Sequence, residues 1–247
     1  MTHDLRTFWG RFFRYDWKFG LALILLICIP RFILVMRANM TGSYQVIALV
    51  MVVSALVPFI FLNREGLKQI GIVRPHSLRM ILASLVIGLI AGLFLYVIGE
   101  WLFAEGEGNW YRYIGRSYQI PEGMAGDEKL IMFAITAGMG MIFSPIGEEL
   151  FFRGIVHDAF ARSLGENRAS LADSTAFALT HLAHFGLIFS GQHWTFLMRP
   201  AILWVIAMFL VSRLFFFFKQ SAGSLLGAIL CHAAFNLAMI YAIFYLL

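Results

Sequence analysis

Long apolar runs dominate this chain and limit what it can fold into. Of its 247 residues, 60% are hydrophobic and only 13% are charged, an apolar excess far above that of soluble globular domains. A helix needs about 20 apolar residues to cross a bilayer. Runs of about this length lie near residues 19–36, 46–62, 80–103, 129–163, 171–190, 200–218 and 223–247. The sequence therefore predicts an all-α, polytopic membrane protein with a bundle of seven to eight transmembrane helices.

The charges between these runs favour one orientation. Basic residues gather in the N-terminal segment, in the loop 64–79 and near residues 162–168 and 213–219, whereas the connector 104–128 is acidic and aromatic. Because basic loops prefer the cytoplasmic side, we expect a cytoplasmic N-terminus and an external C-terminus. These loops also account for the net charge of +5, so the charge does not call for a nucleic-acid partner.

Two adjacent carboxylates, Glu148 and Glu149, interrupt the fourth apolar run, and Arg153 follows them. A charge inside a membrane costs roughly 2.5–3.5 kcal/mol and usually marks function. On a helix Glu149 and Arg153 are four residues apart and can pair, whereas Glu148 points elsewhere and has no counter-ion of its own. The pair could also serve only to fasten two helices. We expect Pro145 and Gly147 to bend or break the helix just before the two acids.

Two later runs carry polar groups at a similar depth. His181 lies in the fifth run, and His232 and Asn236 share one helical face in the seventh. At 1.5 Å per residue, His181 and His232 lie roughly 15 and 14 Å from the cytoplasmic surface. Together with Glu148 they predict an intramembrane functional site on the cytoplasmic side of the midplane, in a cavity that opens to the cytoplasm or the inner leaflet.

A carboxylate beside a neutral imidazole can take a proton from water, and His and Asn can donate hydrogen bonds to an oxyanion. This combination suits peptide hydrolysis. The same residue types could instead hold a divalent metal such as zinc, although no His-Glu-x-x-His motif is present. A proton- or ion-coupled transporter is a further alternative, but no internal repeat supports it.

The motifs resemble those of the CPBP family of intramembrane proteases, which includes the CAAX prenyl endopeptidases and bacteriocin-immunity-type proteins. The resemblance lies in Glu-Glu-x-x-x-Arg at Glu148, Glu149 and Arg153, Phe-x-x-x-His at Phe177 and His181, and His-x-x-x-Asn at His232 and Asn236. It covers residues 129–247, which we expect to be the catalytic core. Residues 1–128 would add about three helices to the same membrane domain.

The resemblance implies a role for each motif. Glu148 would be the general base that activates water, assisted by His181, and His232 and Asn236 would form the oxyanion hole. The residues in supporting positions would be Glu149, Arg153, Phe177 and His184. Of these, His184 stands outside the minimal motifs, and it could support His181, contribute to a metal site or simply pack. We favour packing.

The resemblance implies a glutamate-type endopeptidase with no obligatory metal, acting on a membrane-associated or C-terminal peptide segment. It also implies a multi-pass protein of a bacterial inner membrane. A non-catalytic member of the same fold, serving as an immunity factor or scaffold, is the alternative. The sequence predicts no oligomeric state.

Overall fold

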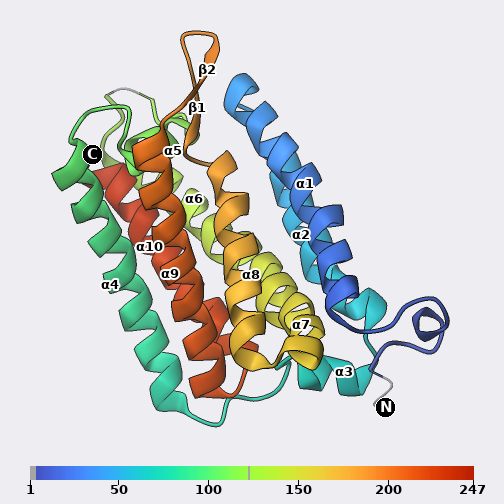
Figure 1. Cartoon of the computed structure of the whole chain (residues 1–247). Helices are drawn as coiled ribbons and strands as arrows, with labels where there is room; N and C mark the ends of the chain where they lie inside the picture. The colour runs from blue at the N-terminus through green and yellow to red at the C-terminus, as the bar shows by residue number, and fades with distance from the viewer. Residues whose placement is uncertain (1–3, 122) are drawn as a thin grey trace.

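The computed structural model describes residues 4–121 and 123–247 and is mostly helical (Figure 1). The long helices are α1 (Trp17–Thr41), α2 (Gln45–Phe61), α4 (Leu78–Phe103), α6 (Gly126–Glu148), α8 (Glu166–Thr180), α9 (Met198–Ala222) and α10 (Leu225–Tyr245). The shorter helical segments are η1 (Trp9–Arg11), α3 (Arg64–Gln69), α5 (Trp110–Arg116), η2 (Glu149–Val156), α7 (His157–Leu164) and η3 (His181–Ala183).

Five helices in the described residues are long and apolar enough to cross a membrane: α1, α4, the continuous helix Gly126–Leu164, α9 and α10. The apolar helix α2 is shorter. Many large apolar side chains on these helices are exposed, as expected where lipid rather than water is the solvent. The predicted all-α, polytopic membrane fold is confirmed.

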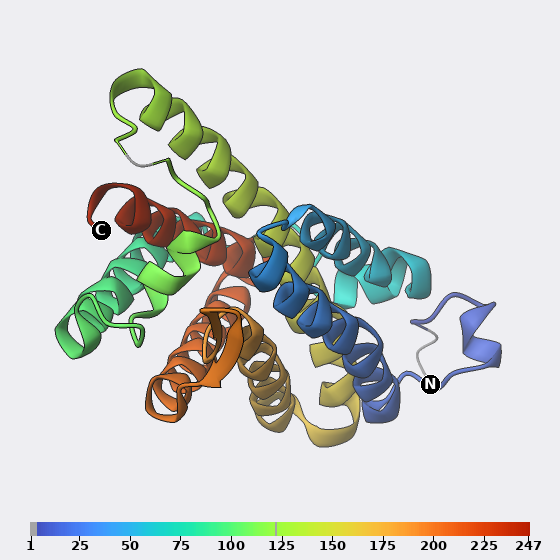
Figure 2. The same ribbon diagram turned by 90° about the horizontal axis from the view of Figure 1, so that it is seen from above.

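Glycines bring the helices close together. Helix α4 packs along α10 (Figure 2), and a Cβ on Gly88 would lie 2.3 Å from the carbonyl oxygen of Cys231. The Gly147 position is equally tight, because a Cβ there would lie 2.5 Å from the carbonyl oxygen of Met51 on α2. Gly147 therefore serves a helix contact.

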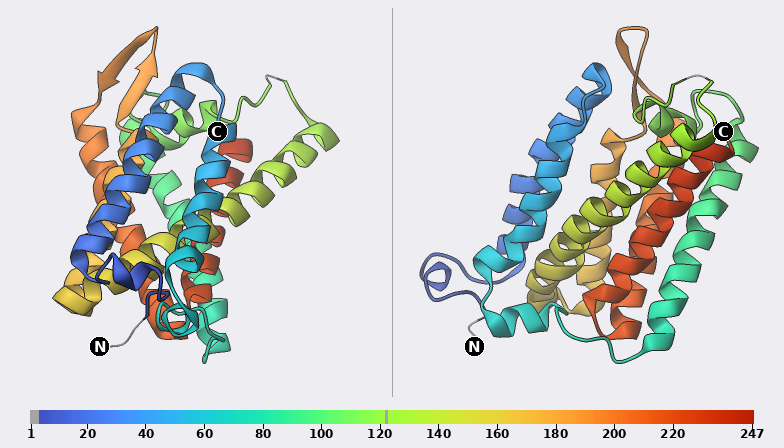
Figure 3. Two further views of the ribbon diagram at one scale, coloured as in Figure 1. Left: turned by 90° about the vertical axis from the view of Figure 1, so that its right-hand side faces the viewer. Right: turned by 180° about the vertical axis from the view of Figure 1, so that it is seen from behind.

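The sequence predicted a bend or a break before the two acids, and the break is wrong. Helix α6 continues through Pro145 to Glu148 and passes directly into η2, which is π-helical, and then into α7. Figure 3 shows this helix crossing the bundle obliquely toward the N-terminal end. Each residue of η2 is buried. A π-helical segment rotates the side chains that follow it relative to an α-helix, and such segments often lie at functional sites.

The prediction of a fifth helix over residues 171–190 is also wrong for its second half. Helix α8 begins at Glu166 and ends at Thr180, and η3 and an antiparallel hairpin follow it. The hairpin strands are β1 (Leu187–Ser190) and β2 (His193–Phe196), with Leu187 opposite Phe196. Gly186 and Gly191 have φ values of 118° and 56°, a left-handed region that glycine adopts without strain, so the chain turns here instead of continuing as a helix.

The two ends of the bundle differ in composition. The described N-terminal residues, α3 and α7 lie at one end, and α5, the hairpin and the C-terminus lie at the other (Figures 1 and 3). The basic loop 64–79 thus belongs to the N-terminal end, and the acidic connector 104–128 contains α5 at the opposite end.

Candidate active site

Glu148 ends α6 with its side chain 1% exposed. Its Oε1 atom accepts hydrogen bonds from Ser144 Oγ at 2.5 Å and from Arg31 Nη2 at 2.8 Å. The Arg31 side chain is itself 4% exposed. The prediction that Glu148 has no counter-ion is therefore wrong, because a cation from α1, far away in the sequence, supplies one.

Arg31 is a site residue that the sequence patterns did not single out. Arg31 follows Pro30, a residue that commonly kinks or ends a helix, but α1 continues through Pro30 to Thr41. Arg31 is therefore well inside the helix. A charged residue in a long apolar run is a functional hint in its own right.

His181 begins η3, directly after α8. Its Nδ1 atom lies 2.7 Å from the carbonyl oxygen of Phe177, and because a carbonyl only accepts hydrogen bonds, Nδ1 must carry the proton. Its Nε2 atom faces Glu148 Oε2 at 3.6 Å. In a neutral imidazole Nε2 is an acceptor, as is a carboxylate oxygen. Both atoms can therefore accept a hydrogen bond, and a water molecule that entered between them could donate to both.

A second set of contacts lies behind His232. Its Nδ1 atom is 2.8 Å from Glu149 Oε1, and Glu149 Oε2 is 3.2 Å from Arg153 Nε. Glu149 and Arg153 are fully buried, and their predicted i, i+4 pair is confirmed. Glu149 thus ties the π-helical segment to α10 and orients the His232 ring, as carboxylates commonly do for functional imidazoles.

Aromatic side chains complete this arrangement. The Arg153 guanidinium lies 4.2 Å from the centre of the Phe177 ring, within the range of a cation–π contact. The Phe177 ring lies 4.2 Å from the His181 ring. His232 stacks on Phe215 at 4.5 Å, with the planes at 15°. Phe177 therefore contacts both the buried cation and one of the two site histidines.

Asn236 lies one helical turn beyond His232 on α10. Its Nδ2 atom donates a hydrogen bond to the carbonyl oxygen of Gly140 at 2.9 Å. This bond fixes the side-chain amide across the gap between α10 and α6, and it leaves the second N–H of the amide available.

One cavity of about 200 Å³ brings these groups together. All four residues expected to be catalytic contribute to its lining: Glu148, His181, His232 and Asn236. Arg31, Ser144, Phe177 and His184 line it too. Glu149 and Arg153 lie behind His232 and are not part of the lining. Residues of three separate sequence motifs thus meet at one intramembrane cavity with Arg31, Ser144 and His184, which lie outside the motifs.

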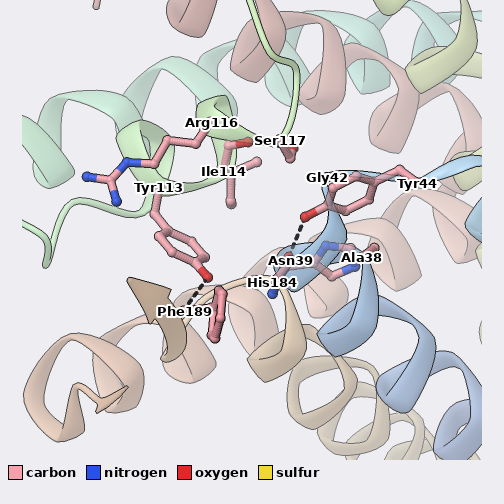
Figure 4. Close-up of a pocket in the computed structure, with 10 residues that line it drawn as sticks. All are labelled: Ala38, Asn39, Gly42, Tyr44, Tyr113, Ile114, Arg116, Ser117, His184 and Phe189. Atoms are coloured by element: carbon pink, nitrogen blue, oxygen red, sulfur yellow. Dashed lines mark hydrogen bonds between the residues drawn. The ribbon is translucent and has the colours of Figure 1, made fainter. Parts of the chain in front are cut away.

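His184 occupies the edge of this cavity. Its ring centre is 5.5 Å from that of His181, and it also lines a second, smaller cavity (Figure 4). It is half-buried, in contrast to the almost fully buried His232.

Among residues 4–121 and 123–247, no group of three or more His, Cys, Asp or Glu side chains could hold a metal ion. The Arg31 guanidinium already lies against Glu148, and a second cation at that carboxylate would meet its repulsion.

Comparison with known proteins finds a match over the part of the chain that carries the three motifs. Residues 130–238 match the family model described as type II CAAX prenyl endopeptidase Rce1-like. The matched stretch is Rce1-like. The resemblance drawn from the three motifs is confirmed over these residues, which include every predicted site residue. No curated protein and no solved structure matches the chain. Residues 130–238 are thus similar to a family of CAAX prenyl endopeptidases, and the five long apolar helices of the described residues indicate an integral membrane protein.

Proposed function

We propose that this protein is a glutamate-type intramembrane endopeptidase that uses Glu148 as its base. The observation that carries the proposal is the environment of the two carboxylate oxygens. Oε1 is held by Ser144 and Arg31, whereas the buried Oε2 accepts no hydrogen bond from the described residues. A buried carboxylate oxygen without a donor is costly, and a water molecule donating to it would relieve that cost.

The reaction follows from these positions. A water molecule between Glu148 and His181 gives a proton to Glu148 Oε2, and its oxygen attacks the peptide carbonyl carbon. The carbonyl oxygen becomes an oxyanion, which the His232 ring and the Asn236 amide can stabilise by donating hydrogen bonds. The carbon–nitrogen bond then breaks, and the protonated Glu148 returns its proton to the leaving amine. The products are a carboxylate and an amine.

Glu149 supports the charge on His232 in this scheme. Because the Nδ1 proton of His232 is directed at Glu149, a donor on Nε2 requires the doubly protonated ring. A buried carboxylate 2.8 Å away stabilises such an imidazolium. Arg153 holds Glu149 in place by pairing with its second oxygen.

We further propose that the substrate is a membrane-associated or C-terminal peptide segment, and that the bilayer is the second partner. The basic loops at the N-terminal end of the bundle favour a cytoplasmic N-terminus, in a bacterial inner membrane. Because the Arg31 guanidinium already neutralises Glu148, we propose that the reaction needs no metal.

The test compares wild type with Glu148→Gln in detergent with a chelator present. Cleavage would be followed on an isoprenylated CAAX peptide and on a pool of lipid-anchored peptides. Losing a general base slows such reactions about 10²–10⁴-fold, so the variant should fall by that factor, whereas Glu65→Gln, a change of an exposed carboxylate, should not. Full activity in Glu148→Gln would refute the mechanism. Activity lost to chelator and restored by zinc would favour a metal site.

A further inference from the structure

The segment before α1, residues 4–16, forms a loop at the side of the bundle, which we call the N-terminal loop. Figures 1 and 3 show it projecting sideways beside the start of α1, at the end of the bundle that carries α3 and α7. The backbone N–H of Arg6 donates to the carbonyl oxygen of Phe61 at 2.9 Å. Just after the loop, the backbone N–H of Trp17 donates to Ser163 Oγ at 3.2 Å. The loop is therefore held to the bundle at both ends.

The aromatic side chains of this loop face two different surroundings. Trp9 faces the bundle, because its ring is 4.8 Å from that of Phe61 and its Nε1 donates to the carbonyl oxygen of Ile60 at 2.9 Å. Phe8 and Phe12 are 58% and 66% exposed, and their ring centres are 5.3 Å apart. Aromatic side chains concentrate at the interface between a bilayer and water. Because the loop projects beside the start of an apolar helix, that interface accounts for the two exposed rings.

A hollow of about 860 Å³ lies between the N-terminal loop, Asn63 and Arg162 of α7, and we call it the arginine hollow. Besides Arg162, its lining contains two further arginines, Arg11 and Arg14. It also contains two carboxylates, those of Asp4 and Asp16. Which charges remain available to a ligand therefore depends on how the carboxylates are paired.

Both carboxylates of the arginine hollow are already engaged. Asp4 forms an ion pair with Arg162, which also pairs with Asp158 of its own helix at 3.1 Å. Asp16 caps the N-terminus of α1, where its side chain accepts two backbone N–H groups at 3.0 and 3.2 Å. A capping carboxylate is also stabilised by the positive end of the helix dipole. Neither carboxylate is thus left to neutralise the other two arginines.

Arg11 and Arg14 are exposed, and within the described part of the chain their side chains form no ion pair or hydrogen bond. Two guanidinium groups on one hollow therefore leave positive charge there without a partner. A guanidinium binds phosphate through two parallel hydrogen bonds, and arginine is the side chain best suited to this geometry. The charge and the donors of the hollow thus fit a phosphate group.

We infer that the arginine hollow binds the phosphate headgroup of an anionic phospholipid, with Arg11 and Arg14 on the phosphate and Phe8 and Phe12 in the bilayer interface. The exposed rings favour a lipid over a soluble phosphate, because they place the hollow at the level of the headgroups. The basic loops at this end favour the cytoplasmic side, where anionic lipids give the membrane a negative surface potential. A bound lipid would hold the N-terminal loop at the start of α1. The inference does not depend on the proposed protease activity.

The test measures, by native mass spectrometry of the full chain in a neutral detergent, the affinity for the first lipid bound. Phosphatidylglycerol is compared with phosphatidylcholine of the same acyl chains and with glycerol 3-phosphate. Each arginine near an anionic membrane surface contributes a factor of about five, so Arg11→Gln/Arg14→Gln should bind phosphatidylglycerol about 30-fold more weakly. The matched control is Arg74→Gln/Arg79→Gln, which neutralises two exposed arginines of the basic loop outside the hollow. It should bind phosphatidylglycerol as wild type does.

A second measurement needs no variant. Because salt screens exposed charges, wild type should bind phosphatidylglycerol more weakly as the ammonium acetate concentration rises. Equal affinity for the two lipids, an equal loss in the two double variants, or an affinity that does not fall with salt would overturn the inference. Glycerol 3-phosphate bound as tightly as phosphatidylglycerol would show a soluble-phosphate site and would also overturn it. No substrate enters these measurements, so a failure of the protease proposal leaves them unaffected.

Discussion

The ion pair between Arg31 and Glu148 leads to a prediction about stability that can be worked out in detail. The two side chains are 4% and 1% exposed and their charged atoms are 2.8 Å apart. Arg31→Met keeps a long apolar side chain on α1 and removes the cation. Glu148 is then left with Ser144 as its remaining partner on Oε1.

Removing one partner of a buried pair costs about 3–5 kcal/mol, because the remaining charge stays buried without compensation. Replacing both partners by neutral groups is often close to neutral. Arg31→Met should therefore destabilise the protein by about that amount, and Glu148→Gln should relieve most of the loss in the double variant. Lys68→Met, which breaks the exposed pair with Glu65, should cost no more than about 1 kcal/mol.

The assay is reversible unfolding in mixed detergent micelles for wild type, the two single variants and the double variant, with Lys68→Met as the matched control. The losses of independent sites add to within about 0.3–0.5 kcal/mol. The deviation from additivity for Arg31 and Glu148 should be well above that value. A double variant whose loss equals the sum of the single losses would refute the reasoning, as would an Arg31→Met loss no larger than that of Lys68→Met.

Three further predictions address packing, catalysis and pH. Gly88→Ala should destabilise the α4–α10 contact by about 1–3 kcal/mol, whereas Gly138→Ala, where an added Cβ meets nothing within 4 Å, should be neutral or stabilising; thermal unfolding of both variants decides this. Asn236→Ala should lower kcat about 10²–10³-fold with little change in KM, and steady-state kinetics showing only a higher KM would contradict an oxyanion role. Burial acts to raise the pKa of Glu166, but the hydrogen bond and charge of His157 outweigh it and lower the pKa. The stability from this carboxylate is thus present above the ordinary glutamate pKa and lost as pH falls through the lowered one. In Glu166→Gln the melting temperature should fall less steeply as the pH drops below about 4.3. A variant whose melting temperature falls as steeply as that of wild type would count against this.

Local spacing explains what could be predicted about the site. The pairing of Glu149 with Arg153 follows from four-residue spacing on a helix, and the placing of His232 and Asn236 on one cavity wall follows from the same rule. Such relations hold even where η2 departs from α-helical geometry, because the two side chains remain about one turn apart. The counter-ion of Glu148 could not be found in this way, since Arg31 lies 117 residues away and no spacing rule links the two.

The sequence alone determined that this chain is a bundle of membrane helices, because apolar runs of sufficient length have no other stable arrangement in a bilayer. It also determined that the polar residues of the three motifs lie within apolar runs. Only the tertiary structure decided how these residues pair and where α8 gives way to a hairpin. The reason is that apolar length acts residue by residue along the chain, whereas the pairing of buried charges and the shape of a cavity depend on helices that meet only after folding.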